Sequence, residues 1–426
     1  MRTRLATLSF FFYVLWLLAV PMEGPLLPAL EAAGCSRWFL CSHVMTLVVI
    51  GRWASPAKLL LFAQIGALAT ALLTLVLPLA PELAPLLLTM LGFTAAPLSA
   101  KACDDLHSAR QPIIAAACCL IGANLMLAII QTTMTMPFWP VVLALLPLLT
   151  IPATTPLTQE DGNRPPLNRS YLVFVFIFQI VSGLMYASLF PAYDVHAFYP
   201  GLELPFYMLA AVVAVMVYQR NRDLLLAGAL IMAMAAFALL QIGGDTAVNI
   251  SMFAMQTAVG CIDMFLLALL LTSKRSVATF GYGLAALCGG IVAGQFFNLA
   301  LNPTSTLLGL TGGLVLNIAA LSLFLRRQHQ EHSHLVTSAE ITLPALPAEF
   351  FGLLSKREMN VLALVLEGKN YREAARELAI SESSIKTYMK RICDKIGVSN
   401  RSELLQKIGQ ADRQERQLWN SNGSTI

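Results

Sequence analysis

The sequence predicts an all-α protein, a polytopic membrane helix bundle of about twelve spans followed by a small four-helix domain in the cytoplasm. Two observations support this prediction. Hydrophobic residues make up 57% of the 426 residues and charged residues only 12%, whereas a soluble domain carries about 25% charged residues. The charges are also uneven: up to residue 327 they stand mostly in short breaks between apolar runs, and beyond it Lys and Arg are frequent.

A helix needs about 20 apolar residues to cross the hydrocarbon core of a membrane. The first apolar run follows a basic start, as in a signal peptide, but Ala19-Val20-Pro21 is a poor cleavage site. We therefore expect a retained first helix. The predicted spans are residues 6–28, 36–51, 58–80, 82–100, 111–131, 138–156, 170–190, 203–219, 223–242, 247–272, 277–300 and 304–325.

Basic residues in the breaks orient these spans, because cytoplasmic loops carry an excess of Lys and Arg. With the N-terminus inside, the outer side holds Arg37 alone. The cytoplasmic side holds Arg2, Arg4, Arg52, Lys58, Lys101, Arg110, Arg164, Arg169, Arg220, Arg222, Lys274, Arg275, Arg326 and Arg327. The pattern predicts a multi-pass protein of the bacterial inner (cytoplasmic) membrane, with both termini in the cytoplasm.

A polar stretch, Thr158–Arg169, divides the predicted spans into two sets of six. It is rich in Pro, Asn and charge and is typical of a loop. This six-plus-six layout over residues 1–327 resembles the major facilitator transporter fold. Members of that family carry Gly, Asp and clustered Arg between the second and third helices, but Gly51–Lys58 contains no Asp. The departure favours a transporter fold kept for binding over active transport.

Residues 328–350 differ from the spans before them and predict a linker, because they lack helical periodicity and contain Pro344 and Pro347. The three histidines His329, His332 and His334 could bind a metal, but no other ligand stands near them, so we expect solvated side chains and no metal site. The linker joins a compact domain at residues 351–410, and a polar tail follows at 411–426.

The compact domain begins with a capping box at Ser355 and Glu358, which starts a helix that Gly368 ends. Asn370, with Glu373 three residues later, starts a second helix. Ala379-Ile380-Ser381 makes a turn, and Ser381 caps a third helix that Gly397 closes. Residues 399–408 form a short fourth helix. The helices direct these residues inward: Val361, Leu362, Val365, Leu366, Ala374, Ala375, Leu378, Ile385, Met389 and Ile392.

The third helix has a basic outer face, as a helix that enters the major groove of DNA requires. The run from Leu354 to Leu405 resembles the LuxR-type DNA-binding domain. The matching pieces include Leu354–Glu358, Glu367-Gly368, Ile380-Ser381 and Lys395–Val398. Departures are Tyr388, where His is common, and Ala374, where Ile is common.

The resemblance implies how this domain contacts double-stranded DNA. It places Lys386, Thr387 and Lys390 on the base-contacting face, and makes Arg391, Lys395 and Arg401 phosphate contacts. Because Glu373, Glu377 and Glu382 offset the basic residues, we expect a homodimer on DNA, paired through the last helix as is common in the family. The alternatives are a charged helical tail without a binding role, or a helix-turn-helix that contacts protein.

Polar side chains within the spans suggest a second site. Asp263 lies in the middle of an apolar run and His43 lies in the second span. A carboxylate there costs about 2.5–3.5 kcal/mol, so it should face a cavity or a partner. The two form a candidate intramembrane ligand or proton site. Neutral amides that could line the same cavity, or only hold helices together, are Gln179, Gln256, Gln295 and Asn298.

These features predict a membrane-bound, one-component transcription regulator whose bundle senses an unknown small molecule or a membrane signal and whose tail binds promoter DNA. The alternative is an active transporter with a regulatory tail that binds DNA or protein. We expect no enzyme and no cofactor, because the sequence lacks a nucleophile–base constellation, metal-ligand spacing and a glycine-rich phosphate loop.

Overall fold

The computed structural model describes residues 2–22, 26–30, 34–133, 138–153, 164–199, 201–301, 305–337, 353–378 and 380–408. The chain divides into two compact units, Met1–Phe324 and Leu325–Ile426. The described residues form helices and no strand, so the all-α prediction is confirmed. The polar tail at 411–426, residues 338–350 of the predicted linker and residues 158–163 of the predicted central loop lie outside the described residues.

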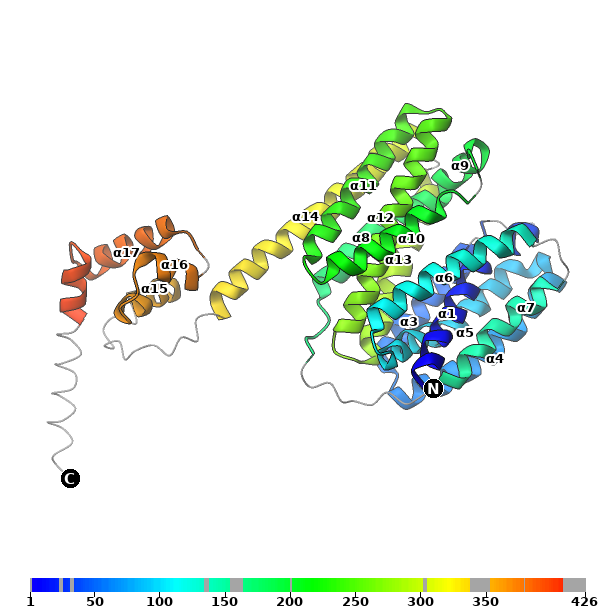
Figure 1. Ribbon diagram of the computed structural model, residues 1–426, viewed down its shortest axis with the longest axis horizontal. Helices are drawn as coiled ribbons and strands as arrows, with labels where there is room; N and C mark the ends of the chain where they lie inside the picture. The colour runs from blue at the N-terminus through cyan, green and yellow to red at the C-terminus, as the bar shows by residue number, and fades with distance from the viewer. Residues whose placement is uncertain are drawn as a thin grey trace, which may run out of the picture. The chain divides into compact units, whose positions relative to one another are not determined.

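The first half of the larger unit contains the helices drawn from blue to cyan in Figure 1. They are α1 (Arg2–Ala19), α2 (Leu26–Ala29), α3 (Ser36–Trp53), α4 (Pro56–Val76), α5 (Ala84–Asp105), α6 (Pro112–Thr133) and α7 (Trp139–Leu145), with 3-10 turns at η1 (Leu77–Leu79), η2 (Pro81–Leu83), η3 (Leu106–Ser108) and η4 (Leu146–Ala153). The predicted first span is too long, because α1 ends at Ala19, two residues before Pro21. The predicted fourth span is too short, because α5 continues to Asp105.

The second half contains the helices drawn from green to yellow in Figure 1. They are α8 (Arg169–Leu184), the π-helix η5 (Met185–Leu189), α9 (Phe190–His196), α10 (Leu204–Tyr218), α11 (Arg222–Ile242), α12 (Asp245–Thr272), α13 (Val277–Leu301) and α14 (Ser305–Thr337). Because α14 runs on to Thr337, the first part of the predicted linker is helical. Pro191 has no N–H to continue α-helical bonding, and the π turn η5 immediately precedes it.

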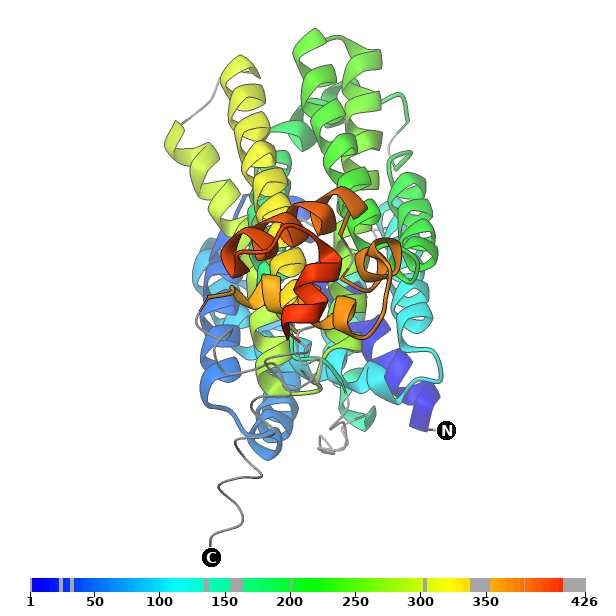
Figure 2. The same ribbon diagram turned by 90° about the vertical axis from the view of Figure 1, so that its left-hand side faces the viewer.

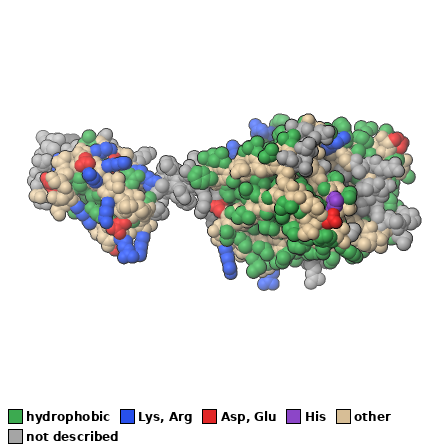
Figure 3. Space-filling view, turned by 90° about the horizontal axis from the view of Figure 1, so that it is seen from above, with side chains coloured by type: hydrophobic (Ala, Val, Ile, Leu, Met, Phe, Trp, Pro, Cys, Tyr) green, Lys and Arg blue, Asp and Glu red, His purple; other side chains and the backbone are tan. Residues whose placement is uncertain are grey.

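Each predicted span coincides with a helical segment, including the two short runs that became α3 and α10. Within the residues that the structure describes, seven segments are long and apolar enough to cross a membrane: Pro56–Leu79, Pro81–Ser108, Pro112–Thr133, Arg222–Ile242, Asp245–Thr272, Val277–Ala300 and Leu307–Leu325. Shorter apolar helices are Leu5–Ala19, Trp139–Thr150, Arg169–Leu184 and Leu204–Tyr218. Apolar side chains cover much of the face of this unit that Figure 3 shows. The exposed apolar residues of the unit include Leu72, Met216 and Ile231, which suits contact with apolar lipid tails.

The two halves contact each other mainly where α3 packs on α13 and α6 packs on α10, with smaller contacts of α6 with α12 and of α5 with α13. Glycines allow α3 and α13 to approach each other closely. A Cβ atom added to Gly281 would lie 2.7 Å from the Cα of Gly51, so α13 has no room for a side chain at this position. Small residues allow this kind of backbone approach between membrane helices.

The smaller unit folds around its own apolar core. Its helices are α15 (Lys356–Leu366), α16 (Tyr371–Glu377), α17 (Glu382–Ile396) and a fourth helical stretch at 401–408 (Figure 2). Both predicted capping boxes are present, at Ser355 with Glu358 and at Asn370 with Glu373. Gly397 ends α17 with a φ of 73°, a conformation that glycine adopts without strain. The predicted inward residues are buried except Leu366, which is half-buried.

Candidate functional site

The helix α17 presents a basic face to solvent. Its apolar side chains Ile385, Met389, Ile392 and Ile396 are buried, which turns the opposite face outward. That face exposes Lys386, Thr387, Lys390 and Arg391. Lys386 pairs with Glu382 one turn earlier at 3.0 Å. This exposed pair contributes little energy, so Lys386 can leave it for a stronger partner. In Figure 3 the smaller unit carries several Lys and Arg side chains on the face shown, with acidic ones between them.

The other two predicted phosphate contacts have partners inside the domain. Lys395 Nζ lies 2.7 Å from the Glu358 carboxylate, and so ties α17 to the capping box of α15. Arg401 donates to the carbonyl of Lys369 at 3.1 Å and lies over the Tyr371 ring. Sequence reasoning did not foresee either contact. Both residues therefore help to pack the helices of the domain against each other, and their contacts with phosphates stay a prediction.

Electrostatics in the smaller unit follow from these contacts. Burial by itself raises the pKa of Glu358, but hydrogen bonds from Lys395 and from the Ser355 backbone outweigh burial and hold the pKa below its ordinary value. Hydrogen bonds to Glu377 and Glu367 raise the pKa of Lys369. Both groups are therefore charged at neutral pH.

Asp263 lies on α12 and faces the second half's other helices. Its Oδ1 accepts a hydrogen bond from Gln179 Nε2 at 3.0 Å, and its Oδ2 accepts one from the Tyr207 hydroxyl at 3.1 Å. The residues on either side, Ile262 and Met264, are fully packed, whereas Asp263 is partly open. Three helices (α8, α10 and α12) thus hold one carboxylate at the wall of a cavity.

The cavity lies between the two halves and has a volume of about 500 Å³. The first half contributes side chains from α1, α3 and α6, and the second half from α9, α10, α12 and α13. Its polar lining residues are Ser36, Arg37, Asn124, Gln131, Asp194, Glu203, Tyr207, Gln256, Asp263, Gln295 and Asn298. Three of the four amides singled out from the sequence therefore line it, and the fourth, Gln179, binds Asp263.

The structure does not bring His43 into this cavity. His43 lies between α3 and α5, where Nδ1 is 3.3 Å from the Gly92 carbonyl and Nε2 is 3.3 Å from the Ser99 hydroxyl. Its ring stacks on Phe39. With both ring nitrogens occupied, His43 connects two helices of the first half and has no contact with Asp263.

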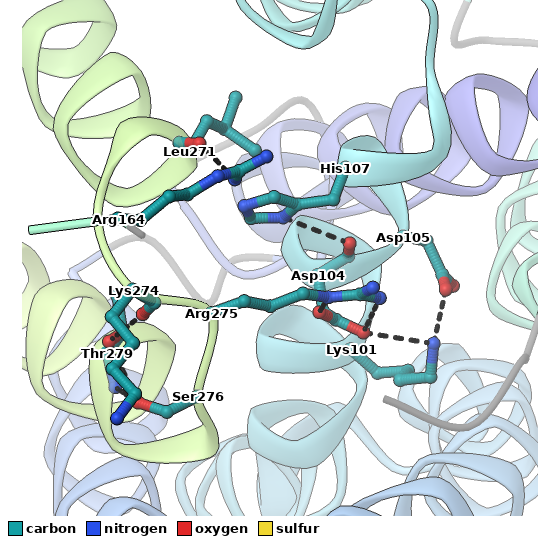
Figure 4. Close-up of polar contacts among 10 residues, drawn as sticks. All are labelled: Lys101, Asp104, Asp105, His107, Arg164, Leu271, Lys274, Arg275, Ser276 and Thr279. Atoms are coloured by element: carbon teal, nitrogen blue, oxygen red, sulfur yellow. Dashed lines mark hydrogen bonds and ion pairs between the residues drawn. The ribbon is translucent and has the colours of Figure 1, made fainter. Parts of the chain in front are cut away.

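A buried ionic cluster joins the halves at the opposite end of α12 and α13 (Figure 4). Arg275, between these helices, donates two hydrogen bonds to Asp104 of α5, at 2.6 and 3.0 Å. Lys101 pairs with both Asp104 and Asp105. Asp104, Asp105 and Lys101 are almost completely buried. Sequence reasoning placed Lys101 and Arg275 in loops and did not notice the acidic residues that pair with them.

Two further contacts extend this junction. Arg164, which precedes α8, donates to the Leu271 carbonyl at 3.0 Å. His107 hydrogen-bonds through Nδ1 to the Asp104 carbonyl and packs edge-on against Phe280 of α13. The cluster therefore combines charge pairing with ring packing across the two halves.

Comparison with known proteins identifies the smaller unit. Residues 352–408 match the model for bacterial regulatory proteins of the LuxR family. The spore germination protein GerE of Bacillus subtilis (strain 168) is 36% identical over 56 residues, which are 13% of this chain and 76% of GerE. Through this domain the chain belongs to the LuxR family. The transcriptional regulatory protein DesR of the same organism is 42% identical over 52 residues, 12% of this chain but only 26% of DesR. The LuxR-family match is thus confined to the C-terminal domain.

The larger unit has the fold of membrane transporters. A bacterial homologue of the iron transporter ferroportin, solved in an outward-facing state, superposes with a TM-score of 0.54 and 13% identity. The fucose:proton symporter FucP of E. coli gives a TM-score of 0.51 and 15% identity. Each match covers 76% of this chain and nearly all of the other, 97% and 98%. These likenesses confirm the predicted major-facilitator-like fold.

One chain therefore joins a membrane-embedded, transporter-like bundle to a LuxR-family DNA-binding domain. Neither family consists of enzymes in general. The bundle supplies a cavity, and the LuxR-family domain supplies a basic helix.

Proposed function

We propose that this protein is a membrane-bound, one-component transcription regulator. The bundle senses a small molecule through the cavity between its halves, and the LuxR-family domain binds promoter DNA. The observation that carries the proposal is the presence of both parts in one chain. A regulator of this kind needs no separate sensor protein, because ligand site and DNA reader share a polypeptide.

In this proposal α17 reads DNA in the major groove. Lys386, Thr387 and Lys390 contact bases, because they are exposed on the face opposite the buried one. Arg391, Lys395 and Arg401 contact phosphates, the last two from positions fixed by Glu358 and Tyr371. Two copies bind together and pair through residues 402–408, because one domain offers only a modest positive charge.

The proposed site of action is the bacterial inner membrane, with both termini in the cytoplasm. The basic residues of the loops support this orientation. It puts the ionic cluster on the cytoplasmic side. The cavity then faces outward, because its lining residues lie toward the other ends of α12 and α13. A ligand would reach it without entering the cell.

The proposed switch is a change in how the two halves pack. The cavity and the ionic cluster both lie between the halves, at opposite ends of the same helices. A ligand that binds one arrangement better than another shifts the balance between them. That shift would change whether two DNA-binding domains can pair on adjacent half-sites.

A transporter with a regulatory tail is the second candidate function, because the larger unit has a transporter fold. A transporter moves its ligand across the membrane, whereas a sensor needs only to bind it. Uptake of the ligand that binds the cavity distinguishes the two.

The test is recovery of genomic DNA crosslinked to the full-length protein in its native membrane. We expect discrete sites for the wild type and loss of at least about tenfold in enrichment for a Lys386→Ala/Lys390→Ala variant, because each lost base contact costs about 1–3 kcal/mol. The matched control is Arg52→Ala/Lys58→Ala, which removes two exposed cations from the bundle and should keep the sites. Equal enrichment in all three proteins, or none in the wild type, would reject the regulator.

A further inference from the structure

The lining of the cavity is acidic. Asp194, Glu203 and Asp263 come from the second half, and Arg37 from the first half is the basic residue among those that line it. Even if Arg37 balances one of the acids, the lining keeps an excess of negative charge. Low-dielectric walls concentrate the field of such charges in a cleft. The cavity should therefore favour a positively charged occupant.

Asp263 is the acid that most needs such an occupant. Its partners Gln179 and Tyr207 are neutral donors, and it forms no ion pair within the described part of the chain. A carboxylate at membrane depth is costly unless a charge or a water-filled cavity compensates it. The two neutral hydrogen bonds hold the carboxylate in place at the cavity wall without cancelling its charge.

Two hydrogen-bond acceptors near Asp263 and the cavity are not used within the described part of the protein. The Oε1 atoms of Gln179 and Gln295 are buried and have no hydrogen-bond partner. Gln179 is 1% exposed and reaches Asp263 with its amide nitrogen, while Gln295 lines the cavity. A buried acceptor without a partner costs about 1–3 kcal/mol. A ligand that carries N–H donors would satisfy the Gln295 oxygen and the Asp263 carboxylate together, because both residues line the cavity.

The polar groups that line the cavity suit an organic cation better than a metal ion. Among the described residues, no group of three or more His, Cys, Asp or Glu side chains could hold a metal. The volume of about 500 Å³ lies within the range of pockets for small organic molecules. Amide oxygens and a single central carboxylate are suitable partners for an ammonium, amidinium or guanidinium group.

We propose that the cavity binds a small organic cation with N–H donors, and that Asp263 is its counter-charge. The proposal rests on the proposed function in taking the cavity as the ligand site. It does not depend on whether binding leads to sensing or to transport. The N–H groups bind the Asp263 carboxylate, and the remaining donors reach the Oε1 atom of Gln295.

The test uses three probes of one size, benzamidine, benzamide and benzoate, which are a cation, a neutral molecule and an anion. Each is titrated against purified full-length protein in detergent, and binding is read from the shift in melting temperature. We expect benzamidine to bind at least about tenfold more tightly than benzamide, and benzoate to bind least. Equal or tighter binding of benzamide or benzoate, or no shift with benzamidine, would overturn the proposal.

Asp263→Asn is the decisive variant, because it removes the charge and keeps two polar atoms for Gln179 and Tyr207. Its own melting temperature without ligand reports whether it folds. We expect the apparent affinity for benzamidine, read from the shift in melting temperature, to fall at least about tenfold. Glu82→Gln is the matched control, since it removes an exposed carboxylate that does not line the cavity. Persistence of the benzamidine shift in a folded Asp263→Asn protein contradicts the proposal.

Crosslinked DNA separates this inference from the proposed function. If benzamidine binds through Asp263 while neither it nor any other cavity ligand changes DNA recovery, the cation site stands and the sensing proposal fails. If a neutral or anionic compound changes DNA recovery through the cavity and benzamidine does not bind, sensing stands and the cation site fails.

Discussion

At the scale of single residues, Glu358 has two functions in the LuxR-family domain. Its carboxylate caps the start of α15 by accepting from the Ser355 N–H at 2.7 Å, and it also holds Lys395 of α17. Because the carboxylate accepts from both groups, and these hydrogen bonds outweigh the effect of burial, its charged form is stabilised in the folded domain. One side chain thus joins the first helix of the domain to the helix proposed to read DNA.

The pKa of Glu358 predicts how the domain responds to acid. The folded-state pKa of Glu358 is lowered. Its carboxylate therefore contributes fully to the stability of the domain above the unfolded pKa of about 4.3, and this contribution is lost as the pH falls from there through the folded-state pKa. We expect α15 and α17 to lose protection together in that range. Hydrogen–deuterium exchange of the full-length protein, corrected for the intrinsic exchange rate at each pH, measures this.

Lys395→Met tests the same contact from the other side. We expect it to destabilise the domain by about 1 kcal/mol, because Lys395 is half exposed and water weakens the pair. Lys390→Met, on the same helix but exposed, is the control and should leave protection unchanged in the absence of DNA. Equal protection in the two variants would contradict a stabilising role for Lys395.

Single residues were the least predictable feature of the candidate site. Asp263 was found from sequence because a carboxylate within an apolar run is costly, and the structure places it at a cavity. The same argument singled out His43, which the structure places away from this cavity, with its ring nitrogens near Gly92 and Ser99. It also missed Asp104 and Asp105, because they stand where a helix was expected to have ended. They could be recognised as ion-pair partners only from the fold, because Arg275 is distant from them in the sequence.

At the scale of elements, helix ends were predictable where the sequence carries a local signal. Ser355, Asn370 and Ser381 cap their helices as their hydrogen-bonding side chains indicate. The end of α5 was not predictable, because tertiary contacts decide it. Lys101 and its acidic partners can extend α5 to Asp105 because Arg275 offsets their charge.

The contact between α3 and α13 depends on glycine. In Gly281→Ala the new Cβ would lie 2.7 Å from the Gly51 Cα and 2.8 Å from the Leu47 carbonyl. These are backbone atoms, so the helices themselves must move apart. We expect a loss of about 1–3 kcal/mol, as for overpacking elsewhere, measured as a lower melting temperature in detergent.

Gly228→Ala is the control for this substitution, because nothing lies within 4 Å of the added Cβ on α11. Alanine favours a helix over glycine by about 1 kcal/mol, so this variant should be unchanged or more stable. A Gly281→Ala protein as stable as Gly228→Ala would show that the two halves are not held by this close approach.

At the scale of the whole molecule, the layout was the most predictable feature. The length of the apolar runs predicts the spans, and the basic residues in the loops predict their orientation. Long-range packing, such as α3 against α13, leaves no local signal in the sequence. The cavity follows from that packing, which is why its acidic lining could be described only from the structure.

We expect the ionic cluster to hold the two halves of the bundle together at one end. Arg275 and Asp104 join the halves at the end of α12 and α13 opposite the cavity. Removing one charge from a buried pair costs about 3–5 kcal/mol, because its partner stays buried and unpaired. Asp104→Asn removes the carboxylate charge that Arg275 and Lys101 share and should therefore favour arrangements in which this end is open to water.

The thiol of Cys103 reports that opening, because it lies next to Asp104 and is only 3% exposed. We expect maleimide to label Cys103 at least about tenfold faster in Asp104→Asn, since each 1.4 kcal/mol shifts a population tenfold. Asp223→Asn is the control, because its hydrogen bond with the Tyr171 hydroxyl lies within the second half. Mass spectrometry of the labelled peptide gives the rate. If Cys103 stays as protected in a folded Asp104→Asn protein as in the control, the cluster does not hold the halves together, and the switch must lie elsewhere in the bundle.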